Sequence, residues 1–142
     1  MEKIRDLTGI VVAGGKSSRM GRDKAFLDWQ GRPLIQAAVE SLVSYVSEVI
    51  VVAKDKEKFN FLKVPVYQDR QSEFSPLVGI ATGLFYSRTE FNFVLACDMP
   101  QIKMGVVKQL YEAMGDFDVV LPKSSYGPEP LLATPEELAE RL

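Results

Sequence analysis

Short runs of apolar residues alternate along the chain with longer segments in which apolar and polar positions mix. Runs rich in Val and Ile are typical of strands buried on both faces of a sheet. Three clear runs predict such strands, over Leu7–Ala13, Glu48–Ala53 and Phe91–Cys97. Two shorter runs, Val64–Tyr67 and Asp118–Leu121, predict shorter strands.

Between these runs, apolar residues recur at helical spacing. Pro33 suits the first position of a helix, because that position needs no N–H donor. One apolar face of this helix would carry Leu34, Ala37, Ala38, Leu42 and Tyr45. Helices are also expected over Leu77–Ser87 and Val106–Met114.

Glycines mark two further features, one inside a predicted helix and one in a predicted turn. Gly79 and Gly83 weaken the predicted Leu77–Ser87 helix, but they would allow close packing or close approach of a ligand. Ala25–Trp29 is expected to be extended, ahead of a turn at Gln30–Gly31. Strands alternating with helices predict an α/β domain, with a mainly parallel sheet flanked by helices.

Ligands of such sheets bind where the strands have their carboxyl ends. The loops after Ala13 and after Cys97 are therefore the first places to look for a site. The segment 14–24, GGKSSRMGRDK, combines glycines with four cations, although the chain as a whole is acidic. Glycines let backbone N–H groups turn toward an anion, so this loop suits a polyphosphate. A solvated basic surface loop is the alternative.

The spacing of this loop rejects two familiar motifs. A P-loop would need glycine where the chain has Ile10, and Gly14, Gly15 and Gly21 do not match a dinucleotide fingerprint.

In the second loop, Asp98 follows a buried strand, where an unpaired charge costs several kcal/mol. Mg²⁺ bound to substrate phosphates would compensate it. Asp98 could instead cap the turn before Met99.

Composition narrows the classes of function. With 142 residues and 46% apolar content, the chain suits one domain, and a formal net charge of −2 argues against a general nucleic-acid binder. No apolar run approaches the roughly 20 residues that span a membrane, and no signal peptide is recognised, so we expect a cytoplasmic protein. The absence of histidine and the single Cys97 exclude His-based catalysis and multi-thiolate metal sites. Any catalysis must therefore rely on carboxylates, on Lys and Arg, on backbone N–H groups and on hard metal ions.

The segment VVAGGKSSRMGRDKAFLDWQGRPLIQ resembles the signature of the molybdenum cofactor guanylyltransferases, within the Rossmann-like nucleotidyltransferases. The resemblance implies a loop wrapped around a nucleoside triphosphate. By position, it places Val12, Ala13 and Gly14 along the nucleotide, Gly15 and Arg19 at its phosphates, and Lys24 at the α-phosphate.

Three further segments carry the resemblance. Cys97-Asp98-Met99-Pro100 resembles an element whose Asp coordinates Mg²⁺, and Asp69 stands where the family carries an Asp that helps to bind the guanosine. Ser75 to Gly79 resembles a Gly-Pro-Leu-Ala-Gly turn. Ala53 stands where some relatives have Asn, and it cannot supply that side-chain hydrogen bond.

The family's reaction transfers GMP from GTP to the phosphate of molybdenum-molybdopterin, which forms the guanine dinucleotide cofactor and releases pyrophosphate. The resemblance therefore implies Mg²⁺ as cofactor, Arg19, Lys24 and Asp98 as catalytic residues, and other cofactor-assembly proteins as partners. Two alternatives stay open. One is a related nucleotidyltransferase that uses CTP or a sugar phosphate acceptor, and the other is a GTP- and Mg²⁺-binding module without transfer activity.

Two segments that the family normally separates by several tens of residues are adjacent in this chain. They are Pro128–Ala133 and the helix start at Thr134–Leu138. A single nucleotidyltransferase domain over residues 1–142 is thus expected to lack, or to skip, an internal stretch between Ala133 and Thr134. That stretch helps to form the molybdopterin side of the cleft.

Overall fold

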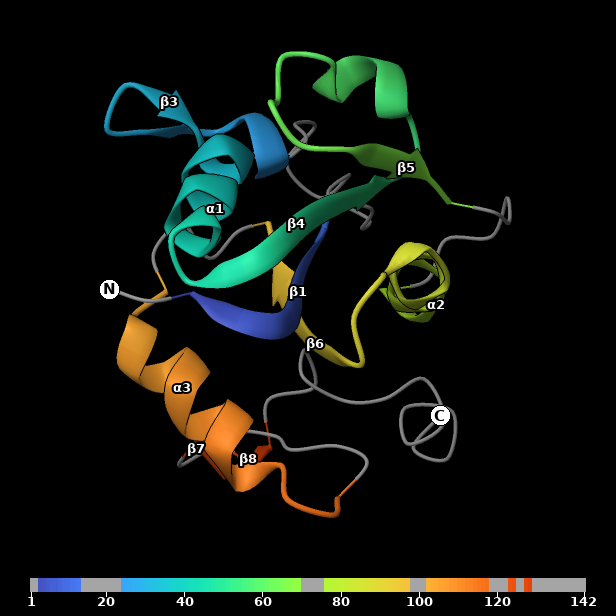
Figure 1. Cartoon of the computed structure of the whole chain (residues 1–142). Helices are drawn as coiled ribbons and strands as arrows, with labels where there is room; N and C mark the ends of the chain where they lie inside the picture. Colours follow the sequence, from blue (N-terminus) through green and yellow to red (C-terminus); the bar gives the residue numbers. More distant parts are fainter. Residues whose placement is uncertain are drawn as a thin grey trace.

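A computed structural model describes residues 3–13, 24–69, 76–97, 102–117, 123–124 and 127–128 (Figure 1). Among these residues, strands and helices alternate along the chain. In order they are β1 (Ile4–Val12), η2 (Lys24–Phe26), β2 (Asp28–Trp29), β3 (Arg32–Pro33), α1 (Leu34–Val43), β4 (Val46–Ala53), η3 (Lys56–Phe59), β5 (Val66–Gln68), α2 (Pro76–Tyr86), β6 (Phe91–Ala96), α3 (Met104–Ala113), β7 (Lys123–Ser124) and β8 (Gly127–Pro128), where η marks a 3₁₀ helix.

The main sheet has four parallel strands in the order β5-β4-β1-β6. Its centre is β1, whose Ile10 lies opposite Ile50 of β4 on one side and Val94 of β6 on the other. The predicted α/β architecture, with a mainly parallel sheet flanked by helices, is confirmed. The crossover from β5 to β6 passes over two strands, so the chain changes direction across the sheet between β1 and β6.

Each face of the sheet has its own apolar core. Alternate residues of β4 point to opposite faces: Val49 and Val51 join one core, whereas Ile50 and Val52 join the other. The larger core also takes residues of α1 and α3, and the smaller one takes residues of α2. Figure 1 shows this arrangement, with α1 and α3 on one side of the sheet and α2 on the other. Burial on both faces explains why the strands are almost continuously apolar.

Helix α2 lies unusually close to β1 because of its two glycines. A Cβ atom on Gly83 would stand 2.5 Å from Cγ2 of Ile10, and one on Gly79 would stand 2.8 Å from Cγ1 of Val12. Both separations are far shorter than a van der Waals contact. The close packing that the sequence suggested for Gly79 and Gly83 is therefore confirmed.

The connection from the glycine-rich segment to α1 differs in detail from the prediction. Residues 24–26 form the 3₁₀ helix η2, and only Asp28–Trp29 is extended, as one strand of a two-residue hairpin with Arg32–Pro33. Gln30 and Gly31 form its turn with φ of +52° and +88°, so the predicted turn is confirmed. Pro33 has ψ of 143° and precedes α1 instead of starting it.

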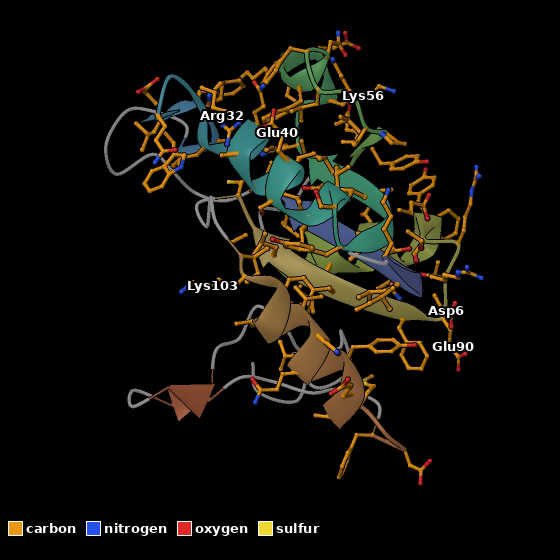
Figure 2. All side chains as sticks on the ribbon, turned by 60° about the vertical axis from the view of Figure 1, so that its left-hand side comes forward. Asp6, Arg32, Glu40, Lys56, Glu90 and Lys103 are labelled. Carbon is orange, nitrogen blue, oxygen red and sulfur yellow. The ribbon has the colours of Figure 1, made fainter. Side chains whose placement is uncertain are left out.

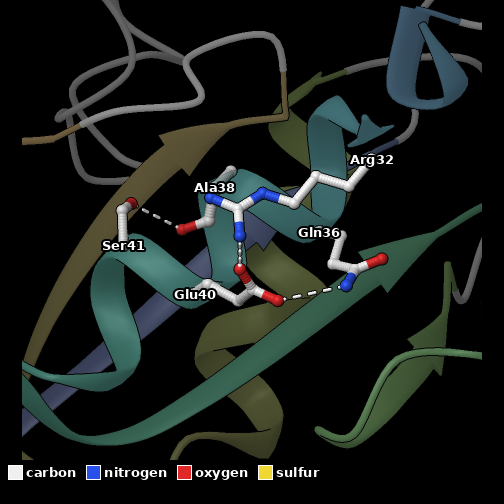
Figure 3. Close-up of polar contacts among 5 residues, drawn as sticks. All are labelled: Arg32, Gln36, Ala38, Glu40 and Ser41. Carbon is white, nitrogen blue, oxygen red and sulfur yellow. Dashed lines mark hydrogen bonds and ion pairs between the residues drawn. The ribbon is translucent and has the colours of Figure 1, made fainter. Parts of the chain in front are cut away.

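The exposed face of α1 is polar, as an amphipathic helix requires. Figure 3 shows Glu40 accepting hydrogen bonds from Gln36 and from Arg32, which also forms an ion pair with Glu40. In the same view, the Ser41 hydroxyl donates to the carbonyl oxygen of Ala38. The contact between Arg32 and Glu40 ties the β2–β3 hairpin to the helix that follows it, and the other two contacts lie within α1.

Several other boundaries can be compared with the sequence. The predicted strands at Leu7–Ala13, Glu48–Ala53 and Phe91–Cys97 and the predicted helices at Leu77–Ser87 and Val106–Met114 are confirmed to within two to three residues at nearly every end. The third predicted strand is shifted, to Val66–Gln68, and the sequence did not predict η3 or the β7–β8 hairpin. The expected strand at Asp118–Leu121 and helix start at Thr134 lie outside the described residues. None of the described helices is long and apolar enough to cross a membrane.

Candidate functional site

The carboxyl ends of the four parallel strands meet at one edge of the sheet. The Ala13 N–H, just after β1, donates to the Val52 carbonyl at 2.8 Å, and the Cys97 N–H, just after β6, donates to the Val12 carbonyl at 3.2 Å. The Asp69 N–H, after β5, donates to the Ala53 carbonyl at 3.0 Å. Both loops singled out by the sequence therefore leave from adjacent strands, at the change of direction in the sheet where ligands of such folds bind.

The glycine-rich segment is fixed at both of its ends. Ala13, where it begins, is 8% exposed, and Ala25, just after it ends, is fully buried. Both belong to the larger core. The residues on either side of the segment are therefore held by the same packed core.

Asp69 is the sequence-predicted site residue that the structure describes most fully. Its carboxyl group is half-buried, and Oδ1 is fully buried without a hydrogen-bond partner among the described residues. A Cβ on Gly79 would lie 3.8 Å from this atom as well as against Val12. Gly79 therefore lies tightly against Val12 and close to Asp69, although β4 separates the strands that carry these two residues.

Burial raises the pKa of the Asp69 carboxyl above its ordinary value, and the positive charge of Lys54 acts in the opposite direction. Lys54 is exposed and follows β4 directly, next to the strand from which Asp69 emerges. An acceptor oxygen held in partial burial suits a ligand with N–H donors, since such donors would satisfy the oxygen and stabilise its charge.

Ala53 ends β4 beside this pair. It is fully buried and contributes its backbone carbonyl to the Asp69 N–H. No side-chain hydrogen bond comes from this position, as the sequence indicated. A polar side-chain contact at the end of β4 must instead come from the next residue, Lys54.

The structure places the other predicted residues to different degrees. Val12 and Ala13 lie at the end of β1, and the backbone of Lys24 starts η2. Gly14, Gly15, Arg19, Ser75 and Asp98 lie outside the described residues, and Pro76–Gly79, which were expected to form a turn, begin α2 instead. Figure 2 shows Lys103 where β6 leads toward α3, and Asp6 with Glu90 at the opposite end of the sheet.

A magnesium site was predicted at Asp98, the residue after Cys97, which lies outside the described residues. Among the described residues, no group of three or more Cys, Asp or Glu side chains is placed to hold a metal ion. The donor set that the chain offers, one carboxylate after β6, fits Mg²⁺, because this ion binds through one or two carboxylates together with phosphate oxygens and water.

Sequence reasoning missed two residues of this edge. Lys54 carries a charge that acts on Asp69, and Gly79 lies tightly against Val12 and close to the Asp69 carboxyl. Ligands of parallel sheets bind where the strands have their carboxyl ends. This rule pointed to the residues after Ala13 and Cys97, and it would have pointed to Lys54 as well if it had been applied to β4. Gly79 was noticed only as a residue that permits close approach, since its neighbours depend on how α2 packs.

The strand order and the switch point beside β1, where both loops start, define an α/β domain of the doubly wound type, in which ligands bind at this edge of the sheet. Comparison with known proteins then identifies the family. Residues 9–142 match the family model described as a MobA-like NTP transferase domain, and the chain belongs to this family.

Three relatives illustrate the similarity. Two proteins named "Probable molybdenum cofactor guanylyltransferase" are 40% identical over 74% of this chain (Aquifex aeolicus) and 37% identical over 91% of it (Carboxydothermus hydrogenoformans). A crystal structure of the Aquifex aeolicus protein Aq1419 is 34% identical, with a TM-score of 0.74 over 94% of this chain and 74% of that one.

The chain is shorter than these relatives. It spans 52% of the Aquifex aeolicus sequence relative and 65% of the Carboxydothermus hydrogenoformans one. The fold and the family follow from the matched part. The activity of a whole enzyme needs a separate argument.

Proposed function

We propose that this protein transfers GMP from GTP to the phosphate of molybdenum-molybdopterin and releases pyrophosphate. The observation that carries the proposal is the common origin of the two motif-bearing loops. Ala13 and Cys97 are joined to neighbouring strands at one edge of the sheet, so a triphosphate held by the first loop would lie next to the carboxylate of the second. The guanylyltransferase names of the relatives support the same reaction.

The chemistry requires little beyond charge compensation and alignment. The acceptor phosphate is already a nucleophile, so neither a histidine nor a covalent intermediate is needed. Repulsion between two anionic reactants is the main obstacle. Arg19, Lys24 and the N–H groups of Gly14 and Gly15 would offset the charge on the α-phosphate and on the departing pyrophosphate.

Asp98 would hold Mg²⁺ at the same phosphates. The ion, when bound, supplies a Lewis acid that neutralises charge on the phosphoryl oxygens. In the proposed site, Asp98 is the only residue to which we assign a metal-binding role. Val12 and Ala13 would lie along the nucleoside, at the end of the strand from which the phosphate-binding loop departs.

Asp69 is proposed to bind the guanosine part of the substrate. Its buried Oδ1 has no partner among the described residues, and guanosine offers N–H and O–H donors that could satisfy it. Ionisation of the carboxyl strengthens such a bond, because hydrogen bonds to charged acceptors are about twice as strong as neutral ones.

A second candidate is a GTP- and Mg²⁺-binding module without transfer activity. The guanylyltransferase names belong to relatives of which this chain spans 52% and 65%, so they do not separate this candidate from the transferase. A nucleotidyltransferase that uses CTP or a sugar phosphate acceptor is the remaining alternative.

The test is pyrophosphate release from Mg²⁺-GTP in the presence and absence of molybdenum-molybdopterin. We expect acceptor-dependent release by the wild type and a loss of about a hundredfold or more in Asp98→Ala, because the metal would no longer be held. Lys24→Ala should lower kcat and also weaken GTP binding, because the same charge would contact the α-phosphate before and during transfer. Asp116→Ala, at an exposed turn after α3, serves as the control that removes a carboxylate elsewhere.

Each alternative predicts a different result. GTP binding without pyrophosphate release would identify the binding module, and faster turnover of CTP than of GTP would identify the related transferase. Near-normal turnover by Asp98→Ala would reject the metal-binding role of that residue.

A further inference from the structure

Lys24 is carried by a short helix that has little internal structure of its own. Helix η2 spans three residues, Lys24–Phe26, and follows directly on the glycine-rich segment. A single 3₁₀ turn is marginal in isolation, so its position must be set by contacts with the rest of the molecule. Whatever holds η2 also determines where the backbone of Lys24 lies.

Two contacts hold the C-terminal side of η2. Ala25 is fully buried in the larger core. One residue beyond the helix, the Leu27 carbonyl accepts a hydrogen bond of 2.9 Å from the Leu34 N–H, at the first residue of α1. These contacts fix the chain after Lys24, but Ala25 offers only a small side chain for packing.

The third contact is aromatic. The Phe26 ring stacks on Phe59 with a centroid separation of 5.0 Å and an interplanar angle of 15°. Phe61 lies against both rings, with centroids 6.1 Å from Phe26 and 6.5 Å from Phe59. We call these three rings the phenylalanine cluster. Figure 1 shows the two segments it joins, η2 and η3, at the same end of the molecule.

The partner of Phe26 is itself well anchored. Phe59 is 2% exposed and ends η3. The turn is built from local hydrogen bonds: the Asp55 carboxylate accepts from the Glu57 N–H, and the Asn60 amide donates to the Glu57 carboxylate. The η3 turn follows β4 closely, so the cluster connects η2 to the sheet strand that ends beside the candidate site.

We propose that Phe26, stacked on Phe59, is a positioning residue that fixes Lys24 for nucleotide binding. The inference rests on the proposed function, because it assigns Phe26 a role only through Lys24. Phe26 is 39% exposed, more than a residue needed solely for core packing would be. Its stack holds η2 in place before the nucleotide binds, so that less ordering of the loop end is required on binding.

The experiment measures the affinity of the full chain for a fluorescent GTP analogue with Mg²⁺, in a double-mutant cycle. Lys24→Met should weaken binding about tenfold or more, because a charged contact to phosphate is lost. Phe26→Leu should weaken it about fivefold, the value of an aromatic pair. The double variant should bind as Lys24→Met does, since Phe26 acts only through Lys24.

Two further variants separate positioning from general stability. Phe26→Tyr keeps the ring and places its hydroxyl on a partly exposed side chain, so it should bind within about twofold of wild type. Phe85→Leu is the matched control: Phe85 is 62% exposed and makes an edge contact with Tyr86, away from the cluster. Its affinity should not change.

The outcomes separate this inference from the proposed function. If the wild type does not bind the GTP analogue, the proposed function fails and the inference fails with it. If Lys24→Met weakens binding but Phe26→Leu does not, only the inference is overturned. The same holds if Phe26→Leu costs as much in the Lys24→Met background as in the wild type.

Discussion

In the proposed site, Asp69 stands where binding of the nucleoside and folding stability oppose each other. Burial of its carboxyl disfavours the ionised form, and the charge of Lys54 compensates this effect only in part. The ionised group is nevertheless the better acceptor for the donors of a nucleoside. A group that is costly to bury but well suited to bind a ligand is common in functional sites.

This opposition gives a prediction for stability. The pKa of Asp69 is raised in the folded protein above the ordinary 3.8. Between 3.8 and the raised pKa, the folded state therefore binds more protons than the unfolded state. The free energy of unfolding therefore falls as the pH rises through that window, and the loss persists above it. Asp69→Asn removes the charge and should raise Tm at pH 7, with a smaller difference at pH 4.

Thermal unfolding at the two pH values tests this prediction, with Asp116→Asn as a control at an exposed turn. The same Asp69→Asn protein should bind Mg²⁺-GTP more weakly than wild type. If Asp69→Asn is no more stable than wild type at pH 7, burial of the ionised carboxyl does not destabilise the folded protein.

Helix α2 shows how a single element sets the geometry of the site. Its glycines at 79 and 83 face Val12 and Ile10, one turn apart on the helix and two residues apart on β1. Gly83 brings the helix onto the sheet. Gly79 allows the helix to lie directly against Val12, close to the Asp69 carboxyl.

Gly83→Ala is therefore expected to destabilise the protein. The new methyl group would meet Cγ2 of Ile10 at 2.5 Å, and a branched side chain on a buried strand has little freedom to move. Overpacking of this kind costs about 1–3 kcal/mol, which outweighs the roughly 1 kcal/mol that alanine gains over glycine in a helix. Urea unfolding should show a lower midpoint with an unchanged slope.

Gly105→Ala is the matched control. Gly105 lies in α3 and is exposed, and a methyl group added there would have no other atom within 4 Å. The helix gain of up to about 1 kcal/mol should therefore appear alone. Opposite signs for the two variants are expected. A stabilised Gly83→Ala protein would mean that α2 can move away from β1 without cost.

The connection into α1 was predicted less well than the long elements, for a physical reason. The sequence of residues 25–29 is apolar enough for a strand, yet residues 24–26 turn as a 3₁₀ helix. Their conformation follows from the burial of Ala25 and from the stack of Phe26 on Phe59, a residue far along the chain. Local propensity does not contain such a contact.

At the scale of the whole molecule, the sheet collects the ends of four strands into one edge, and the proposed nucleotide lies across several of them. Binding should therefore stabilise the fold as a unit. The stabilisation depends only on the ratio of free ligand to Kd, provided that the unfolded chain does not bind.

Mg²⁺-GTP at about a hundredfold excess over Kd should stabilise the protein by about 2.7 kcal/mol. For a chain of this size, that corresponds to a rise in Tm of about 8 °C. CTP at the same concentration should give a clearly smaller rise, and GTP without Mg²⁺ should do the same. Equal shifts for both nucleotides would contradict the proposed preference for guanosine, while leaving nucleotide binding intact.

By itself, the sequence determined the class of fold, the positions of the long strands and helices, and the two loops that carry candidate chemistry. Those features depend on local patterns: apolar runs such as Glu48–Ala53, glycines followed by cations, and a carboxylate after Cys97. Only the tertiary structure decided which residues meet. It placed Asp69 near Val12 across β4, set Lys54 next to that carboxyl, and stacked Phe26 on Phe59. These encounters arise from strand order and helix packing, which join residues far apart in the chain and leave no periodic signal in it.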